Sequence, residues 1–347
     1  ATLFPASGSE NVNPDTHLVL TFSETPVLGD SGMIRVYDAV TDQVVDSLDL
    51  SIPSGPTESR TYGPECDYTK VPYDYTRTVV PTNKDTRPGT PSGTAEPTPP
   101  VYQLTIIGGF TDAFHFYPVI VRDSIATIYL HNNMLEYGHT YYVTIDNGVL
   151  NLADGSFQGV TKEDEWTFTT KSDMPELSDT LIVDATGKGD FNTVQGALDF
   201  IPDFNERQTV ILVNPGDYEE LVYTRNKWNV KIKGAGMADT KVHYANNEVF
   251  NPHPLTVKTN EWPGTFPSRR AAFMLDNCKD IVIEDMTIAT DLKGQAEGLL
   301  INGERIALYR VHIIGSGDAL QANGTIYMES CELDGGGDTI LGRGSLF

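Results

Sequence analysis

The sequence predicts an all-β protein with two parts: an antiparallel β-sandwich, then a parallel β-helix whose N-terminal end is capped by a short α-helix. Two patterns carry this prediction. Short alternating strands separated by turn residues fill much of the first half. Near the C-terminus, rows of apolar residues recur at an interval of 20 residues, as in a solenoid.

Length and composition limit the classes of protein to consider. At 347 residues the chain can hold two domains with their own cores. A net charge of −24 disfavours nucleic acid and anionic membranes as partners. Because no apolar run approaches the ~18 residues of a membrane-spanning helix, we expect no membrane span. The start, Ala1–Pro5, lacks the basic and apolar regions of a signal peptide, so we expect any such peptide to have been removed.

The three cysteines, Cys66, Cys278 and Cys331, are scattered along the chain. They are too few for a disulfide framework and too far apart for a zinc site. The cysteines therefore do not identify the compartment, and we expect no metal site from them.

The first part, residues 1–171, carries the strand pattern. Turn residues at Asn11–Asp15 precede Leu18, Leu20 and Phe22 in alternation, which predicts a half-buried strand. Further strands are predicted at residues 34–37, 125–130, 140–145 and 166–169. Between about Pro53 and Pro100 the chain turns to Pro, Thr, Ser and Tyr, which predicts an insertion in the sandwich.

A polar stretch with one proline, residues 172–180, is predicted to be a linker, and the second part covers residues 181–347. Asn192 and Gln195 have the spacing of a capping box at the start of a helix that Pro202 ends. We expect this short amphipathic helix to close the open end of the solenoid. A proline-containing interruption at about residues 245–268 should leave the stack as a loop.

The 20-residue repeat is clearest in two rows, Ile306–Asp318 and Ile326–Asp338, and the row Ile281–Ile288 fits the same template without the aspartate. A polar pair interrupts the apolar alternation once in each row, as a corner between two strands would. The predicted inward positions are Ile281, Ile283, Met286 and Ile288; Ile306, Leu308, Val311 and Ile313; and Ile326, Met328, Cys331 and Leu333.

Asp318 and Asp338 occupy the same position of consecutive rows. Because neighbouring strands lie about 4.8 Å apart, we expect the two carboxyl groups to be neighbours on one surface. Aspartate is common in such turns for conformational reasons alone. Two close carboxyl groups also favour one ionised and one protonated member, which suits a nucleophile beside a general acid. On register alone, the structural and the catalytic roles both stay open.

Several segments in the first part share a pattern with a known domain. They are Asn11–Asp15, Leu20–Ser23, Tyr137–Val143 and Trp166–Thr170. On these segments, residues 1–171 resemble the bacterial Ig-like β-sandwich domain that is appended to many secreted enzymes. We assign no chemistry to this domain.

The second part also resembles a known family. The segments that carry the resemblance are Val183–Pro202, Val213–Glu220, Ile232–Gly236, Gly294–Leu299, Gly315–Leu320 and Gly335–Gly342. On these segments, residues 181–347 are similar to the right-handed parallel β-helix of the pectin methylesterase (pectinesterase) family. The resemblance covers about the N-terminal half of that domain or more, and it implies that further coils would follow Phe347.

The resemblance implies a role for particular residues. Asp338 stands where the family has its nucleophile, and Asp318 where it has its general acid and base. Gln295 lies in the segment that supplies a substrate-site glutamine. The implied reaction uses no metal and no cofactor: Asp338 attacks the methyl-ester carbonyl of a galacturonate unit, Asp318 protonates the departing methanol, and water hydrolyses the acyl-enzyme.

The sequence departs from the family at two places. The family has an oxyanion-donating glutamine immediately before its acid, and this chain has Gly317 there. Losing one such donor can reduce the rate by about 10²–10³. The family's downstream arginine and tryptophan would lie beyond Phe347, and Arg343 does not match that motif.

Three functions therefore stay open. The leading one is a secreted or extracytoplasmic (periplasmic or cell-surface) pectin methylesterase whose partner is methyl-esterified pectin. The second is another β-helix polysaccharide enzyme. A polygalacturonase would show a Gly-His-Gly motif, which is absent, and a pectate lyase would show calcium-binding acidic clusters. The third is a catalytically degenerate pectin-binding or scaffold protein, which Gly317 and the missing coils keep open. No oligomeric state is predicted.

Overall fold

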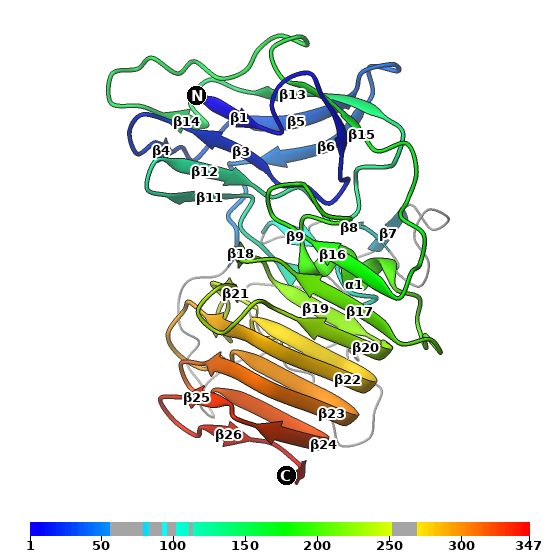
Figure 1. Cartoon of the computed structure of the whole chain (residues 1–347). Coiled ribbons are helices and arrows are strands. Elements are labelled where there is room, and N and C mark those ends of the chain that lie inside the picture. The colour runs from blue at the N-terminus through cyan, green and yellow to red at the C-terminus, as the bar shows by residue number, and fades with distance from the viewer. Residues whose placement is uncertain (56–78, 83–91, 96–101, 111–113, 252–268) are drawn as a thin grey trace.

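The computed structural model describes residues 1–55, 79–82, 92–95, 102–110, 114–251 and 269–347. Figure 1 shows two parts that follow one another: antiparallel sheets containing the N-terminus, and a stack of parallel coils ending at the C-terminus. Most of the predicted insertion at about 53–100, Cys66, and the greater part of the predicted loop at 245–268 lie outside the described residues.

The first part contains two main sheets. One has the order β1 (Thr2–Phe4), β3 (Leu18–Thr21), β12 (Ile125–Ile128), β11 (Val119–Arg122), and all its pairings are antiparallel. The other has the order β2 (Ser9–Val12), β15 (Thr167–Thr170), β13 (Thr140–Ile145), β5 (Met33–Asp38), β6 (Val44–Asp49), with β2 parallel to β15. Among the described residues of this part there are also three short antiparallel pairs: β4 (Val27–Leu28) with β14 (Leu150–Asn151), β9 (Leu104–Thr105) with β10 (Phe114–His115), and β7 (Val79–Thr82) with β8 (Ser92–Ala95).

These strands form because apolar residues alternate along them. In β5, Ile34 and Val36 are buried, and they belong to one core with Leu18 and Leu20 of the other sheet. Trp166 fills this core and donates its indole N–H to the carbonyl of Pro5 at 2.9 Å. The predicted β-sandwich is therefore present. Its kinship to Ig-like domains stays a prediction.

The second part is a parallel β-helix. Its strands form one sheet in which every pairing is parallel. They are β16 (Thr180–Val183), β17 (Thr209–Val213), β18 (Gly216–Glu219), β19 (Val222–Arg225), β20 (Trp228–Lys233), β21 (Thr240–Tyr244), β22 (Phe273–Thr290), β23 (Leu299–Ile314), β24 (Leu320–Glu329), β25 (Glu332–Asp334), β26 (Ile340–Leu341) and β27 (Gly344–Leu346).

The predicted aliphatic ladders are confirmed. Ile281 pairs with Ile306, which pairs with Ile326 on the next coil, and all three are buried. Strands β22 and β23 each run through a corner, at Asp285 and Arg310, and Ser330 lies at the equivalent corner after β24. These three residues have φ angles of 60°, 52° and 55°. The left-handed backbone turns the chain there, which explains why the apolar alternation breaks once per coil.

The predicted helix is α1 (Val194–Phe200), but its cap differs from the prediction. Thr193, not Asn192, is the N-cap, and its hydroxyl accepts the N–H of Gly196 at 2.9 Å. Gln195 does not close a capping box. Its side-chain amide instead donates to the carbonyl of Tyr223 at 2.9 Å. The predicted apolar face is confirmed, because Val194, Ala197, Leu198 and Ile201 lie in the core of the coils. The opposite face is not exposed, since every residue of α1 is buried.

The two parts share a hydrophobic core. Tyr223, Met274 and Leu300 on three successive coils belong to the same cluster of buried residues as the sandwich. Gly108 of the sandwich part approaches β19 so closely that a Cβ there would lie 1.7 Å from the carbonyl oxygen of Tyr223. The sandwich is therefore packed directly on the outer surface of the coils. In the described part of the chain, no helix has the length and apolar character to cross a membrane.

Candidate active site

The two aspartates lie in turns on consecutive coils. Asp318 stands between β23 and β24, and Asp338 stands between β25 and β26. Around them, Ile314 pairs with Asp334 and Leu320 pairs with Ile340, so both aspartates keep the predicted register. The backbone N–H of Asp338 donates to Oδ1 of Asp318 at 3.0 Å. Asp318 is buried and Asp338 is exposed, so one carboxyl group lies beneath the surface that carries the other.

Glycines allow these turns to stack closely. A Cβ at Gly315 would lie 1.6 Å from the carbonyl oxygen of Asp318, and a Cβ at Gly337 would lie 2.8 Å from that of Gly317. The N–H of Gly337 donates to the same Gly317 oxygen. The Gly-rich turns are therefore required by close backbone approach, independently of any chemistry.

Gln295 comes from the preceding coil, between β22 and β23, and is exposed. The N–H of the adjacent Gly294 donates to the hydroxyl of Ser316 at 3.0 Å, which joins the two turns. A Cβ at Gly317 would lie 3.2 Å from Oε1 of Gln295 and 3.0 Å from the carbonyl oxygen of Gly294. Gln295 thus occupies the space beside position 317, where the related family has its own glutamine. The fold brings all four predicted site residues together on three consecutive turns.

One charged group at this site was missed from the sequence. Arg270, just before β22, is largely buried and lies with Nη2 3.6 Å from Oδ2 of Asp318. Its guanidinium also contacts Glu297, which is fully buried, and Glu248. The sequence offers one signal for Arg270, a charged residue directly before the apolar strand β22. The 20-residue repeat does not indicate which carboxylates this arginine contacts.

The charges of this cluster act on one another. Burial opposes the charged form of Arg270, but hydrogen bonds and attraction from Glu297 and Glu248 raise its pKa above the ordinary value. Burial raises the pKa of Glu297, and the nearby Asp318 adds to that rise while Arg270 opposes it. Both pKa values are raised, but with opposite meaning. For Arg270 the attraction to the glutamates outweighs burial and favours the charged form. For Glu297, which is more deeply buried, burial outweighs the attraction to Arg270 and favours the neutral form.

A second polar cluster lies beside the sandwich. The potential ligand atoms of Glu219, His243 and Asp291 lie within 4.8 Å of one another, as a metal site requires. Their charges are already paired, however, since Arg122 Nη2 lies 2.5 Å from Glu219 and His243 Nδ1 lies 2.5 Å from Asp291. We interpret the cluster as an ion-pair network between strand β11 and the coils, and assign it no metal.

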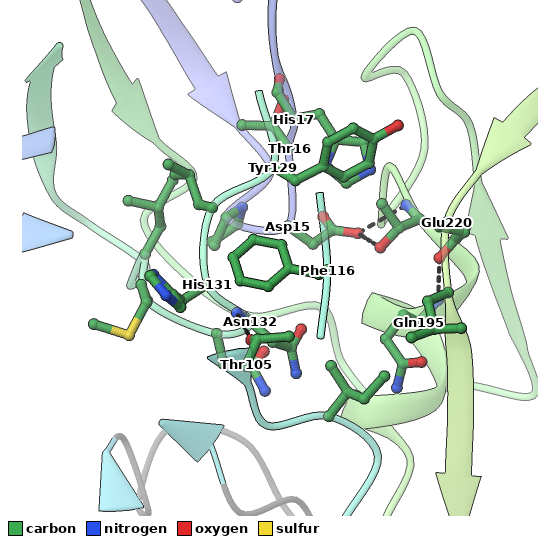
Figure 2. A pocket seen from close by; sticks show the side chains of 18 of the residues that line it. Asp15, Thr16, His17, Thr105, Phe116, Tyr129, His131, Asn132, Gln195 and Glu220 are labelled. Atoms are coloured by element: carbon green, nitrogen blue, oxygen red, sulfur yellow. Dashed lines mark hydrogen bonds between the residues drawn. The ribbon is translucent and has the colours of Figure 1, made fainter. Parts of the chain in front are cut away.

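A cavity of about 100 Å³ lies at the junction of the two parts (Figure 2). Its lining includes Asp15, Tyr129, Gln195 and Glu220, and none of the four predicted site residues. Figure 2 shows the carboxyl groups of Asp15 and Glu220 directed at the start of α1, where hydrogen bonds hold them. The cavity is separate from the turns that carry Asp318 and Asp338. Its carboxyl groups, from Asp15 and Glu220, accept hydrogen bonds from the start of α1 and so stabilise the contact between the two parts.

The C-terminal half is thus a parallel β-helix with a candidate carboxylate site, formed by Asp318 and Asp338 on adjacent turns. Residues 180–347 match the family model described as Pectinesterase. The C-terminal half of the chain is therefore a pectinesterase-family domain.

Two relatives and one solved structure illustrate this similarity. Pectinesterase QRT1 of Arabidopsis thaliana is 30% identical over 171 residues, which cover 47% of this chain and 44% of that protein. Pectinesterase 31 of the same plant is 29% identical over 166 residues, covering 46% and 51%. The structure of pectin methylesterase from carrot gives a TM-score of 0.41 at 22% identity, covering 50% of this chain and 51% of that chain. The chain spans about half the length of the curated relatives that it matches.

Proposed function

We propose that the protein is a pectin methylesterase that hydrolyses the methyl esters of galacturonate units in pectin and releases methanol. The observation that carries the proposal is the pair of aspartates on adjacent turns of a pectinesterase-family domain, joined by the hydrogen bond from the Asp338 N–H to Asp318. The reaction needs a nucleophile and a proton donor side by side, and this pair supplies both.

The proposed reaction has two halves. An oxygen of ionised, exposed Asp338 attacks the ester carbonyl carbon, and the bond to the methoxy oxygen breaks as Asp318 transfers its proton to that oxygen. Methanol leaves, and an acyl-enzyme anhydride on Asp338 remains. Water then attacks the acyl carbon, Asp318 takes its proton, and the galacturonate and the Asp338 carboxylate are released. The side-chain N–H of Gln295 is the proposed donor to the oxyanion in both halves.

The substrate is a polymer outside the cell, so the proposed location is secreted or extracytoplasmic. A chain with a net charge of −24 repels polyanions. We therefore expect highly methylated pectin to be a better substrate than de-esterified pectin.

A second candidate is a protein of the same family that binds pectin without hydrolysing it. Gly317 favours this candidate, because the family's glutamine donor is missing at that position. The location of Gln295 beside Gly317 favours the enzyme, because the same space still holds an amide group.

The test is methanol release from methyl-esterified pectin by the full-length protein, by Asp338→Asn, and by Asp318→Asn. Asp334→Asn is the matched control, because Asp334 lies at the end of β25 close in sequence to Asp338 and pairs with His312 at 2.7 Å. The proposal expects release by the unmodified protein and the control, and a loss of at least about 10²-fold in both site variants. Release that survives Asp338→Asn removes the nucleophile assignment. Chain shortening without methanol indicates a polygalacturonase or lyase, and binding without any product indicates the second candidate.

A further inference from the structure

Arg270 is held by two glutamates from different segments. Its Nε and Nη2 donate to Oε1 of Glu297 at 2.8 and 2.6 Å, and its Nη1 donates to Oε2 of Glu248 at 3.2 Å. The Arg270 side chain is 11% exposed and that of Glu297 is fully buried. A planar guanidinium fixed on two sides has little freedom to rotate, so the direction of its remaining N–H groups is set.

The backbone next to Arg270 is fixed as well. The preceding residue, Arg269, is 1% exposed, and its guanidinium carbon lies 4.5 Å from the ring centre of Phe110 and 4.9 Å from that of Phe114. Both rings belong to the sandwich part. Cation–π contacts with a buried arginine thus anchor this segment to the N-terminal part of the chain.

Arg270 and Asp338 contact opposite oxygens of Asp318. Oδ1 accepts the backbone N–H of Asp338 at 3.0 Å, and Oδ2 lies 3.6 Å from Nη2 of Arg270. The carboxyl group therefore lies between a guanidinium in the protein interior and the turn of the proposed nucleophile. Each oxygen of the Asp318 carboxyl group therefore has a polar contact on its own side.

Arg270 also separates carboxylates that would otherwise face one another. It lies within 4 Å of Glu248, Glu297 and Asp318. Arg270 is therefore a positively charged group that contacts all three carboxyl groups.

We propose that Arg270, clamped by Glu297 and Glu248, is a positioning residue that orients the Asp318 carboxyl group for proton transfer to the leaving methanol. This inference rests on the proposed function. It adds a largely buried arginine that is not among the predicted site residues. Arg270 acts through Asp318 and touches neither substrate nor product in this proposal.

The test compares Arg270→Lys, Arg270→Met and the double variant Arg270→Met/Glu297→Met with the unmodified full-length protein. Arg305→Met is the matched control, because Arg305 makes an exposed bidentate pair with Asp280 at 2.6 and 2.7 Å. Removing Arg270 alone leaves Glu297 buried without its partner and can unfold the protein. The double variant removes Glu297 together with Arg270, so no fully buried carboxylate is left without its partner. The remaining Glu248 has a side chain that is 22% exposed, so water reaches it.

We expect the double variant to melt near the unmodified protein while kcat falls about 10²-fold with little change in KM. Arg270→Lys should recover only part of the loss, because an ammonium group lacks the planar fork. The control should keep its kcat. If the double variant regains the full kcat, Arg270 is only the partner of Glu297, and the inference is wrong.

A second readout is independent of activity. The amide proton resonance of Asp338 reports its hydrogen bond to Asp318 and should move upfield in the double variant as that carboxyl group turns. If the unmodified protein releases no methanol, the proposed function fails, and this resonance still decides the orientation. A resonance that stays at its original position overturns the inference whether or not the protein is an esterase.

Discussion

The N–H of Asp338 donates to Oδ1 of Asp318 at 3.0 Å, so the proposed nucleophile is bonded to the proposed acid through its own backbone. The bond sits where two coils stack in register, with Leu320 paired to Ile340 immediately after it. The two turns that carry the proposed catalytic residues are therefore joined directly at the site.

The first prediction concerns Gln295. As the proposed oxyanion donor, its replacement in Gln295→Ala should lower kcat by about 10²-fold and change KM little. Gly317→Ala should act in the same direction, because its Cβ would lie 3.2 Å from Oε1 of Gln295 and displace that side chain. Steady-state kinetics of both single variants and of the double variant form a double-mutant cycle. The losses in kcat should not be additive, since both substitutions act on the Gln295 side chain. Fully additive losses would show that position 317 does not act through Gln295.

The second prediction concerns Asp15, which joins the sandwich to the coils. Its Oδ2 accepts the backbone N–H groups of Asn192 and Thr193 at 2.9 and 2.8 Å, at the start of α1. Asp15→Ala should lower the free energy of unfolding by about 1–2 kcal/mol, because these donors lose their acceptor. Urea unfolding measures this. The exposed Glu163→Ala should change stability by no more than about 0.5 kcal/mol. Equal effects of the two substitutions would contradict a stabilising role for the hydrogen bonds of Asp15.

The third prediction concerns Glu220, whose two oxygens accept the N–H groups of Val194 and Gln195 at 2.7 and 2.9 Å. Burial raises the pKa of Glu220 from 4.5 to about 7. Between these values the folded protein holds a proton that the unfolded chain releases, so stability should fall as pH rises through this window. The loss amounts to about 3 kcal/mol at most.

Urea unfolding at pH 5 and at pH 8 of the unmodified protein and of Glu220→Gln checks this sign. The stability of the unmodified protein relative to the variant should decrease at the higher pH, because glutamine does not titrate. A relative gain at pH 8 would mean that the two backbone donors stabilise the ionised form more than burial penalises it.

The fourth prediction concerns the aliphatic ladder. Leu308 is fully buried and pairs with Ile283 and Met328 on the coils either side. Leu308→Ala should lower the free energy of unfolding by about 2–5 kcal/mol, through lost burial and the cavity left behind. Tyr327→Ala on the next coil, where the tyrosine is 43% exposed, should cost less than about 1 kcal/mol. A small effect at Leu308 would indicate that neighbouring coils collapse into the space.

The sequence predicts the coils well because their pattern is local and repeated. Each inward residue, such as Ile306, meets its counterpart one coil away, so periodicity alone determines the contact. The juxtaposition of Asp318 and Asp338 follows from the same register. Their chemical roles came from family resemblance, and they remain predictions.

Contacts between distant segments were not predictable in this way. The expected capping box at Asn192 and Gln195 failed because the helix start is satisfied by Asp15, 177 residues before Asn192, and by Glu220. Arg270 likewise meets Glu297 across two stacked coils, and it meets Glu248, which lies 22 residues earlier in the chain. No periodic signal marks such partners, since each pair occurs once.

The shared core has a consequence for the coils taken on their own. Tyr223, Met274 and Leu300 are buried in the same cluster as Phe110 and Phe114 of the first part. Without the sandwich, these side chains would face water on three successive coils. The outer surface of the coils is therefore made for this covering, and the exposed apolar stripe would promote self-association if the covering were removed.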